Sequence, residues 1–475
     1  MIEITKKDIA WSYIANIFSI ASGIIVLPVI LNRLDAEEVG LNYIMLTISS
    51  LVSLLDFGFA PQFGRNFTYV NSGVQSLRKE GIEEEVREKE KINYHLLSIL
   101  LATAKTVYQR ISVVGTLIML SGGTAYIAYI TNGFTSINNS LAIWILFTIS
   151  TYFNIYFTYY NSLLTGSGKV EEANVATFLS KLSYILICIP LLLLNVGLLS
   201  IVIANLIAPF IRRYYSYKKY YTREIRRNLE KNIRKEEIKE TFNTIWYNSK
   251  KLGINFIGAY AVNKSSMFII GFFLPLSVVG SYGILTQIAT LLLSISQTLF
   301  TAYEPKYSYY RVTKDTEGCK NVICLTTLVY LTIMIIGSLG ILFLGPAIFS
   351  LIHSKTVLPS KIIMAIYLTS VTLEGNHSNF ATLIAAENKI PFVKSGLISG
   401  LFIIVLTILC LEISSWGLLG VVLIQFAVQL SYNNWRWPKW ILDEYKMNVL
   451  SIFSKGFKTL SLIIRKANDK DLPRI

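Results

Sequence analysis

Long apolar stretches, separated by short polar segments, run along most of the chain. A helix needs about 20 apolar residues to cross a bilayer core of about 30 Å. Twelve stretches of roughly this length can be traced, and the pattern predicts an all-α integral membrane protein with twelve transmembrane helices. Their approximate bounds are 11–33, 40–64, 107–130, 141–165, 174–195, 197–217, 251–273, 279–302, 321–344, 360–385, 391–411 and 416–437.

The basic residues predict an orientation, because cytoplasmic segments of membrane proteins carry an excess of Lys and Arg. With the N-terminus in the cytoplasm, 40 of the 44 Lys and Arg residues fall in or beside cytoplasmic segments. This count includes Lys181 and Arg212 with the cytoplasmic segments. The outer side keeps Arg33, Lys355 and Lys361. Both termini are therefore expected in the cytoplasm.

The two halves of the sequence repeat. The pair Val39–Gly40 matches Val279–Gly280 at an offset of 240, and Gly197–Leu199 matches Gly417–Leu419 at an offset of 220. The difference fits the long cytoplasmic loop 65–106, whose counterpart in the second half is shorter. Each half holds an even number of spans, so the repeats run in the same direction, as in transporters built from two parallel bundles.

These patterns divide the chain into four parts. We expect a six-helix lobe at 1–211, a basic cytoplasmic linker at 212–250, a second six-helix lobe at 251–437 and a cytoplasmic tail at 438–475. The tail segment 447–466 is basic and amphipathic, and its apolar run is too short to span a bilayer. The sequence therefore predicts an interfacial helix there.

Composition excludes several classes of function. Hydrophobic residues make up 53% of the chain and charged residues 15%, with a mean hydropathy of +0.51. A soluble domain usually carries about 25% charged residues, so a soluble enzyme is excluded. Four scattered cysteines and three histidines indicate neither a disulfide framework nor a metal site. There is no Walker motif for ATP hydrolysis, and the outer loops are too short for the catalytic domain of a membrane glycosyl polymerase. We expect no catalytic residue and no resident cofactor.

Polar residues inside the second half mark a candidate site. Lys264 lies about 20 Å along the seventh span, near the midplane. Glu374 lies in the middle of the tenth span, and the polar residues Asn376 and His377 follow it. Charges at this depth are costly and usually face a cavity or each other. Two interpretations stay open: a structural ion pair between Lys264 and Glu374, or contact with a substrate diphosphate and control by a coupling ion.

The first half has one comparable charge. Asp56 lies near the cytoplasmic end of the second span, nine residues before Arg65. Hydrogen bonds to a neighbouring loop or to Arg65 would explain this carboxylate as helix-end packing. A role in the transport path is the alternative. His377 likewise has a packing interpretation, although its usual pKa of about 6.5 would permit a proton role.

Several segments resemble one family. The segment Leu31–Tyr43 (LNRLDAEEVGLNY) resembles the connection between the first two spans of polysaccharide flippases, and Leu54–Phe59 (LLDFGF) with Arg65 resembles the end of their second span. Leu164–Lys169 (LTGSGK) and Trp416–Gly420 (WGLLG) match later parts of the same pattern. The resemblance covers nearly the whole chain. It is to the Wzx-type repeat-unit flippases for O-antigen or capsule, in the multidrug/oligosaccharidyl-lipid/polysaccharide exporter superfamily.

The resemblance implies two lobes around a central cleft, in a monomer of the bacterial inner membrane. It implies a substrate, an undecaprenyl-diphosphate-linked oligosaccharide, that moves to the outer leaflet by alternating access, and partners among membrane lipids and the polysaccharide polymerase machinery. Transport would be coupled to a proton or sodium gradient. A cation-coupled multidrug exporter of the same superfamily is the alternative. The first span carries no carboxylate, which the drug exporters often have there, and no arginine before Arg33, which the lipid-linked peptidoglycan-precursor flippases typically have.

Overall fold

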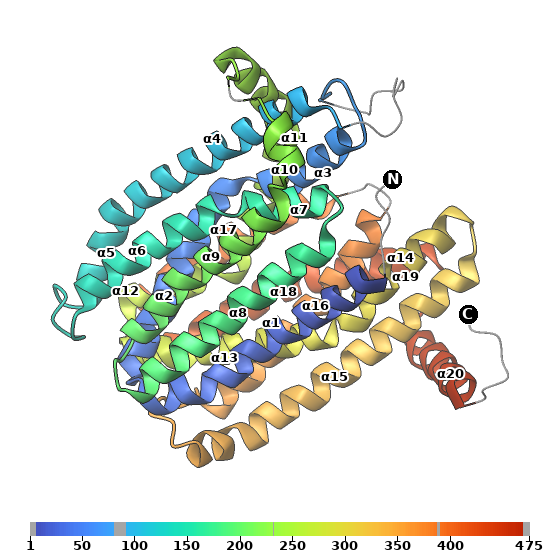
Figure 1. Ribbon diagram of the computed structural model, residues 1–475. Coiled ribbons are helices and arrows are strands. Elements are labelled where there is room, and N and C mark those ends of the chain that lie inside the picture. Colours follow the sequence, from blue (N-terminus) through green and yellow to red (C-terminus); the bar gives the residue numbers. More distant parts are fainter. Residues whose placement is uncertain (1–5, 80–91, 231, 387–389, 469–475) are drawn as a thin grey trace. The chain divides into compact units, whose positions relative to one another are not determined.

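Helices account for nearly all of the ordered backbone (Figure 1). The computed structural model describes residues 6–79, 92–230, 232–386 and 390–468, and these ranges contain no β-strand. The predicted all-α membrane fold is confirmed. Each of the twelve predicted spans coincides with a helix or with a short series of helices in the described ranges.

The first half supplies six such helical runs, followed by a short helix in the predicted basic linker. Their elements are α1 (Lys6–Arg33), α2 (Ala36–Ser53), η1 (Leu54–Asp56), α3 (Phe59–Asn71), α4 (Tyr94–Ile118), the π-helical turn η2 (Met119–Gly123), α5 (Thr124–Ile130), α6 (Ser140–Tyr156), α7 (Tyr159–Gly166), α8 (Val170–Leu193), α9 (Leu199–Tyr220) and α10 (Arg223–Asn228).

The second half supplies six more runs and a tail helix. Their elements are α11 (Lys235–Asn263), α12 (Ser265–Phe273), α13 (Leu276–Ser296), α14 (Thr298–Val312), α15 (Thr316–Leu351), α16 (Lys361–Ala385), α17 (Phe392–Ile413), α18 (Gly417–Ser431), α19 (Asn433–Glu444) and α20 (Val449–Asn468). Several helices extend beyond the predicted apolar bounds, because apolar runs mark only the part of a helix that lies in hydrocarbon.

Eight helices in the described residues are long and apolar enough to cross a membrane, and the bent pair α11–α12 makes a ninth. The remaining predicted spans correspond to α9, α16 and α18 with α19. The helix α16 is long enough but carries the polar stretch around Glu374, while α18 is only 15 residues long. The helices α9 and α16 therefore differ from the other spans in their polar residues, and α18 with α19 differs in being divided into two short helices. The chain is a multi-pass membrane protein.

The chain forms two compact units. Unit 1 comprises residues 1–260, 275–280 and 352–356, and unit 2 comprises 261–274, 281–351 and 357–475. The predicted domain bounds at 211, 250 and 437, and a cleft between the lobes, stay predictions.

The two halves of the chain share the same pattern of helix packing, as the predicted repeat requires. In unit 1, α8 packs against both α1 and α9, and α6 packs against α4 and α9. In the second half, the corresponding α17 packs against α12 and α18, and α16 packs against α15 and α18. The same pairs of spans therefore meet in both halves, as parallel repeats require.

A close helix crossing within unit 1 joins the starts of α2 and α13. A Cβ atom added to Gly40 would overlap the backbone oxygen of Leu276, and one added to Gly280 would lie 2.6 Å from the backbone oxygen of Ala36. Only glycine allows two backbones to approach this closely. Gly40 and Gly280 are the glycines matched by the sequence repeat, so the repeat brings its own equivalent positions into contact.

The tail helix α20 lies against the start of α15 in unit 2. The Lys455 amine donates a hydrogen bond to Glu317 at 2.9 Å. A Cβ added to Gly456 would lie 2.8 Å from the backbone oxygen of Cys324, so a glycine permits the close packing. Phe453 and Phe457 remain exposed. An exposed apolar face on a basic helix beside the start of a span suits the predicted interfacial position.

Candidate functional site

Asp56 is the last residue of η1 and lies just before the break that precedes α3. Its carboxylate accepts hydrogen bonds from the Tyr108 hydroxyl at 2.6 Å and from the Ala60 backbone N–H at 3.2 Å. The two residues that follow, Phe57 and Gly58, have φ values of 44° and 77°, so the chain turns sharply there. These contacts match the packing interpretation of Asp56, because a carboxylate at the start of a helix satisfies free backbone N–H groups.

Arg65 is exposed on α3 and donates a hydrogen bond to the Gln62 side chain at 2.5 Å. In the described part of the chain, the Arg65 guanidinium and the Asp56 carboxylate form no ion pair within 4.0 Å. The structure therefore does not bring these two predicted residues together as a charge pair.

Lys264 lies at the junction of α11 and α12, where the helix axis bends by 42°. Its φ and ψ of −127° and −22° interrupt the helix, so α12 begins at the next residue. The Lys264 side chain is exposed, and among the described residues it forms neither an ion pair nor a hydrogen bond. An apolar span thus carries an ammonium group that no described side chain neutralises.

Glu374 lies half-buried on α16 in a polar environment within unit 2. The side chain of Asn263, the residue before Lys264, is a hydrogen-bond partner of its carboxyl group. Tyr282, Tyr330 and Tyr367 lie within electrostatic range of the same carboxyl. Their hydroxyls could help to hold a proton or a small cation there, since phenol oxygens both donate and accept hydrogen bonds.

The tyrosines around Glu374 are themselves fixed by packing. The Tyr330 hydroxyl donates to the Thr372 backbone oxygen at 2.8 Å, and it passes so close to Gly375 that a side chain there would collide with it. The rings of Tyr282 and Tyr367 meet edge to face with centroids 5.5 Å apart. These contacts hold α13, α15 and α16 around the carboxyl group.

His377 and Asn376 continue the polar stretch one turn further along α16, and both are half-buried. The His377 Nδ1 atom lies 2.8 Å from the Asn434 side-chain oxygen on α19. Two residues after His377, Asn379 accepts a hydrogen bond at 2.9 Å from the side-chain amide of Gln297, which lies between α13 and α14. A hydrogen-bonded role for His377 agrees with these contacts.

The structural ion pair considered for Lys264 and Glu374 is not formed. No contact within 4.0 Å joins the Lys264 amine to the Glu374 carboxylate in the part of the chain that the structure describes. The hydrogen-bond partner of the Glu374 carboxyl is instead the side chain of Asn263, the residue just before the helix break at Lys264. The roles of all six predicted residues in transport stay predictions.

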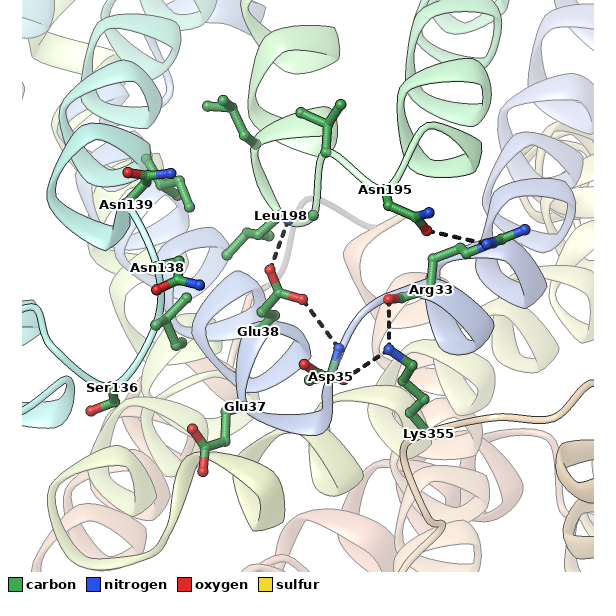
Figure 2. A pocket seen from close by; sticks show the side chains of 15 residues that line it. Arg33, Asp35, Glu37, Glu38, Ser136, Asn138, Asn139, Asn195, Leu198 and Lys355 are labelled. Atoms are coloured by element: carbon green, nitrogen blue, oxygen red, sulfur yellow. Dashed lines mark hydrogen bonds and ion pairs between the residues drawn. The ribbon is translucent and has the colours of Figure 1, made fainter.

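Sequence reasoning missed a polar cavity of about 570 Å³ in unit 1 (Figure 2). It lies where α1 meets α2, beside the turns that end α5 and α8 and beside the segment 352–356. Lys355 donates to Asp35 at 2.9 Å and to the backbone oxygen of Arg33 at 3.2 Å. Arg33 in turn donates to the Asn195 side chain at 3.1 Å. The Glu38 carboxylate accepts hydrogen bonds from the backbone N–H of Leu198 at 3.0 Å and from that of Asp35 at 3.1 Å.

One signal for this cavity was present in the sequence. Arg33 and Lys355 were two of the three basic residues left outside the cytoplasmic segments. Nothing in the sequence indicated that residues so far apart would meet. Their contact depends on the fold, which places 352–356 within unit 1.

No protein-family model matches the chain, and no curated protein matches it. Solved structures do match. A structure described as the lipid II flippase MurJ in an inward closed conformation aligns over 98% of this chain and 93% of its own, with a TM-score of 0.64 and 14% identity. A Vibrio cholerae MATE transporter, VcmN, aligns over 94% and 98%, with a TM-score of 0.56 and 10% identity. The MATE multidrug transporter DinF-BH aligns over 98% and 97%, with a TM-score of 0.53 and 17% identity. The chain therefore shares the fold of these flippases and transporters.

Proposed function

We propose that this protein is a flippase that moves an undecaprenyl-diphosphate-linked oligosaccharide from the cytoplasmic to the outer leaflet of the bacterial inner membrane, for surface polysaccharide synthesis. The observation that carries the proposal is a polar site inside apolar spans of a flippase-like fold. This site combines the Lys264 ammonium, which no described side chain neutralises, with the Glu374 carboxyl on another helix of unit 2.

The physical problem explains why such residues would be needed. A sugar–diphosphate headgroup cannot enter hydrocarbon alone, because its polar groups would lose hydration without gaining partners. A protein path must therefore supply hydrogen bonds and positive charge while the lipid tail remains in the bilayer. Lys264 would contact the diphosphate as a point charge. Glu374 would bind the coupling proton or sodium ion and promote release.

The alternative is a cation-coupled exporter of small molecules. It is supported by the MATE multidrug transporters among the structural neighbours and by the enclosed carboxyl of Glu374, which could couple to a cation in either kind of protein. The lack of any carboxylate in the predicted first span, 11–33, favours the flippase.

Deletion of the gene separates the two functions. For the flippase, the deletion strain should accumulate lipid-linked repeat units on the cytoplasmic side and lose surface polysaccharide, and a plasmid copy should restore it. Lectin or antibody labelling of intact cells measures the polysaccharide. Normal surface polysaccharide together with new drug sensitivity would support the exporter and contradict the proposal.

The orientation can be tested with single cysteines in a variant that lacks the four native ones. We expect cysteines at Ser136 and Ser354 to react with an impermeant thiol reagent added to intact cells. A cysteine at Asn228, at the end of α10 in the basic linker, should react only after the cells are opened, because basic loops stay in the cytoplasm. Mass spectrometry of the purified protein measures the labelling. Labelling of Asn228 from outside would contradict both the twelve-span topology and the proposed direction of transport.

A further inference from the structure

A hairpin of two helices in unit 1 carries cations deep within its length. The helices α8 and α9 pack against each other (Figure 1). The Ser180 hydroxyl on α8 donates to the Ala208 backbone oxygen on α9 at 3.1 Å. This contact fixes the antiparallel register. Lys181 then lies near the middle of the 24-residue α8, about 16 Å from its start, and Arg212 lies on α9 about one turn beyond Ala208. Both were counted with the cytoplasmic segments from sequence, and the structure places both inside helices, as the predicted spans 174–195 and 197–217 also did.

The two side chains carry like charges on facing helices. The Lys181 ammonium lies within electrostatic range of the Arg212 guanidinium. Lys181 is exposed, and Arg212 is half-buried. Neither forms an ion pair or hydrogen bond with any residue that the structure describes. Charged side chains this far inside a protein or a membrane are normally paired, so two neighbouring cations without a carboxylate indicate that an anion completes the site.

Aromatic rings extend this surface toward the end of α9. The Arg213 guanidinium lies over the Phe157 ring at 5.3 Å and near the Tyr217 ring at 6.0 Å. Tyr156 lies within electrostatic range of the same guanidinium. The Arg226 guanidinium also lies over the Tyr217 ring, at 5.3 Å. Phe157 is buried, whereas Tyr217 is exposed, so the Tyr217 ring can stack on a sugar face while the cations can bind phosphate oxygens.

Two further cations lie over tyrosine rings at the end of α9 and just after it. Lys169 lies over the Tyr220 ring at 5.7 Å, and Lys105 lies over Tyr221 at 5.8 Å. Lys169 also donates to the Lys219 backbone oxygen at 2.7 Å. Burial lowers the pKa of Lys169, which lies between the spans α7 and α8. In the described ranges, no ion pair neutralises either lysine.

We propose that Lys181 and Arg212 bind the phosphate groups of a lipid-anchored anion, and that the aromatic surface around Arg213 contacts the sugar attached to it. Naming this anion as a polyprenyl diphosphate rests on the proposed function. An ordinary anionic phospholipid offers the same phosphate chemistry. Its headgroup normally lies at the membrane surface, however, about 15 Å from the middle of a helix that spans the bilayer. The depth of Lys181 therefore favours a headgroup that enters the membrane during transport.

The test measures binding to the purified full chain in nanodiscs of zwitterionic lipid. The probes are undecaprenyl diphosphate and, separately, phosphatidylglycerol. The variants are Lys181→Gln, which changes an exposed side chain and should not affect folding, and Arg212→Lys, which keeps the charge but loses the bidentate geometry. The matched control is Lys218→Ala, an exposed cation near the end of α9.

We expect Lys181→Gln to weaken undecaprenyl diphosphate binding at least tenfold and Arg212→Lys to weaken it severalfold, with the control within twofold of wild type. Phosphatidylglycerol binding should change little. Unchanged binding of undecaprenyl diphosphate by both variants would overturn the assignment, and an equal loss for phosphatidylglycerol would overturn it in favour of a membrane-lipid site. If the wild-type protein itself fails to bind undecaprenyl diphosphate, the proposed function fails and not only this site.

Discussion

Replacing Glu374 by glutamine should reduce surface polysaccharide at least tenfold while leaving membrane abundance close to wild type. Glutamine keeps the size of the side chain and can still hydrogen-bond to Asn263, so the packing around α16 should survive. It removes the group that could take up a proton or a cation. If the carboxyl couples transport to an ion gradient, the translocation cycle stops. Glu412→Gln, an exposed carboxylate at the end of α17, is the matched control and should have no effect.

Variants of Lys264 should be measured alongside Glu374→Gln, for membrane abundance and for surface polysaccharide. A structural pair predicts that Lys264→Ala and Glu374→Gln each lower the amount of folded protein, because stranding a buried charge costs about 3–5 kcal/mol. A structural pair also predicts that exchanging the two residues restores the amount of folded protein. Without an ion pair between them, we expect Lys264→Ala to accumulate normally, to lose transport, and not to be rescued by the exchange. Full transport by Lys264→Ala at normal abundance would exclude its binding role.

Replacing Gly40 by alanine should remove most of the folded protein from the membrane. The new methyl group would overlap the backbone oxygen of Leu276, and a backbone atom cannot move aside as a flexible side chain can. The starts of α2 and α13 would have to separate, and we expect a loss of folding free energy above about 3 kcal/mol, the upper part of the range for overpacked sites. Gly280→Ala should behave similarly, since its methyl group would lie 2.6 Å from the Ala36 oxygen.

Gly340→Ala controls for the loss of glycine itself. Gly340 lies inside α15, and an added Cβ would meet nothing within 4 Å. Alanine should leave the protein as stable as before or slightly more stable, because glycine in a helix costs about 0.5–1 kcal/mol relative to alanine. Membrane abundance and the melting temperature in detergent measure all three variants. Normal abundance and melting of Gly40→Ala would show that the close crossing is not required for folding.

The positions of the spans were predictable because hydrocarbon imposes a minimum length of apolar sequence. The repeat was predictable for a similar reason: Gly40 and Gly280 carry the same sequence signal because they occupy equivalent positions. That these two glycines touch each other could not be predicted, since sequence alignment compares the halves without placing them in space.

The candidate site was only partly predictable. Lys264 and Glu374 stand out because charges are rare inside apolar runs, but the preference of Glu374 for Asn263 depends on the helix break at Lys264. Lys181 and Arg212 were counted with the cytoplasmic segments although the predicted spans 174–195 and 197–217 contain them, because apolar runs give only approximate bounds. The continued helices α8 and α9 and their register place the two side chains together.

Transfer of the proposed substrate across a membrane tests the central claim most directly. The purified protein would be reconstituted into vesicles loaded on one leaflet with an undecaprenyl-diphosphate-linked oligosaccharide, and a lectin outside the vesicles would detect sugar that reaches the outer leaflet. An imposed proton or sodium gradient would drive the reaction. We predict transfer well above that of protein-free vesicles, and its loss in Glu374→Gln. Transfer no faster than in protein-free vesicles under either gradient, by a protein that remains folded and transports an organic cation, would contradict the flippase function.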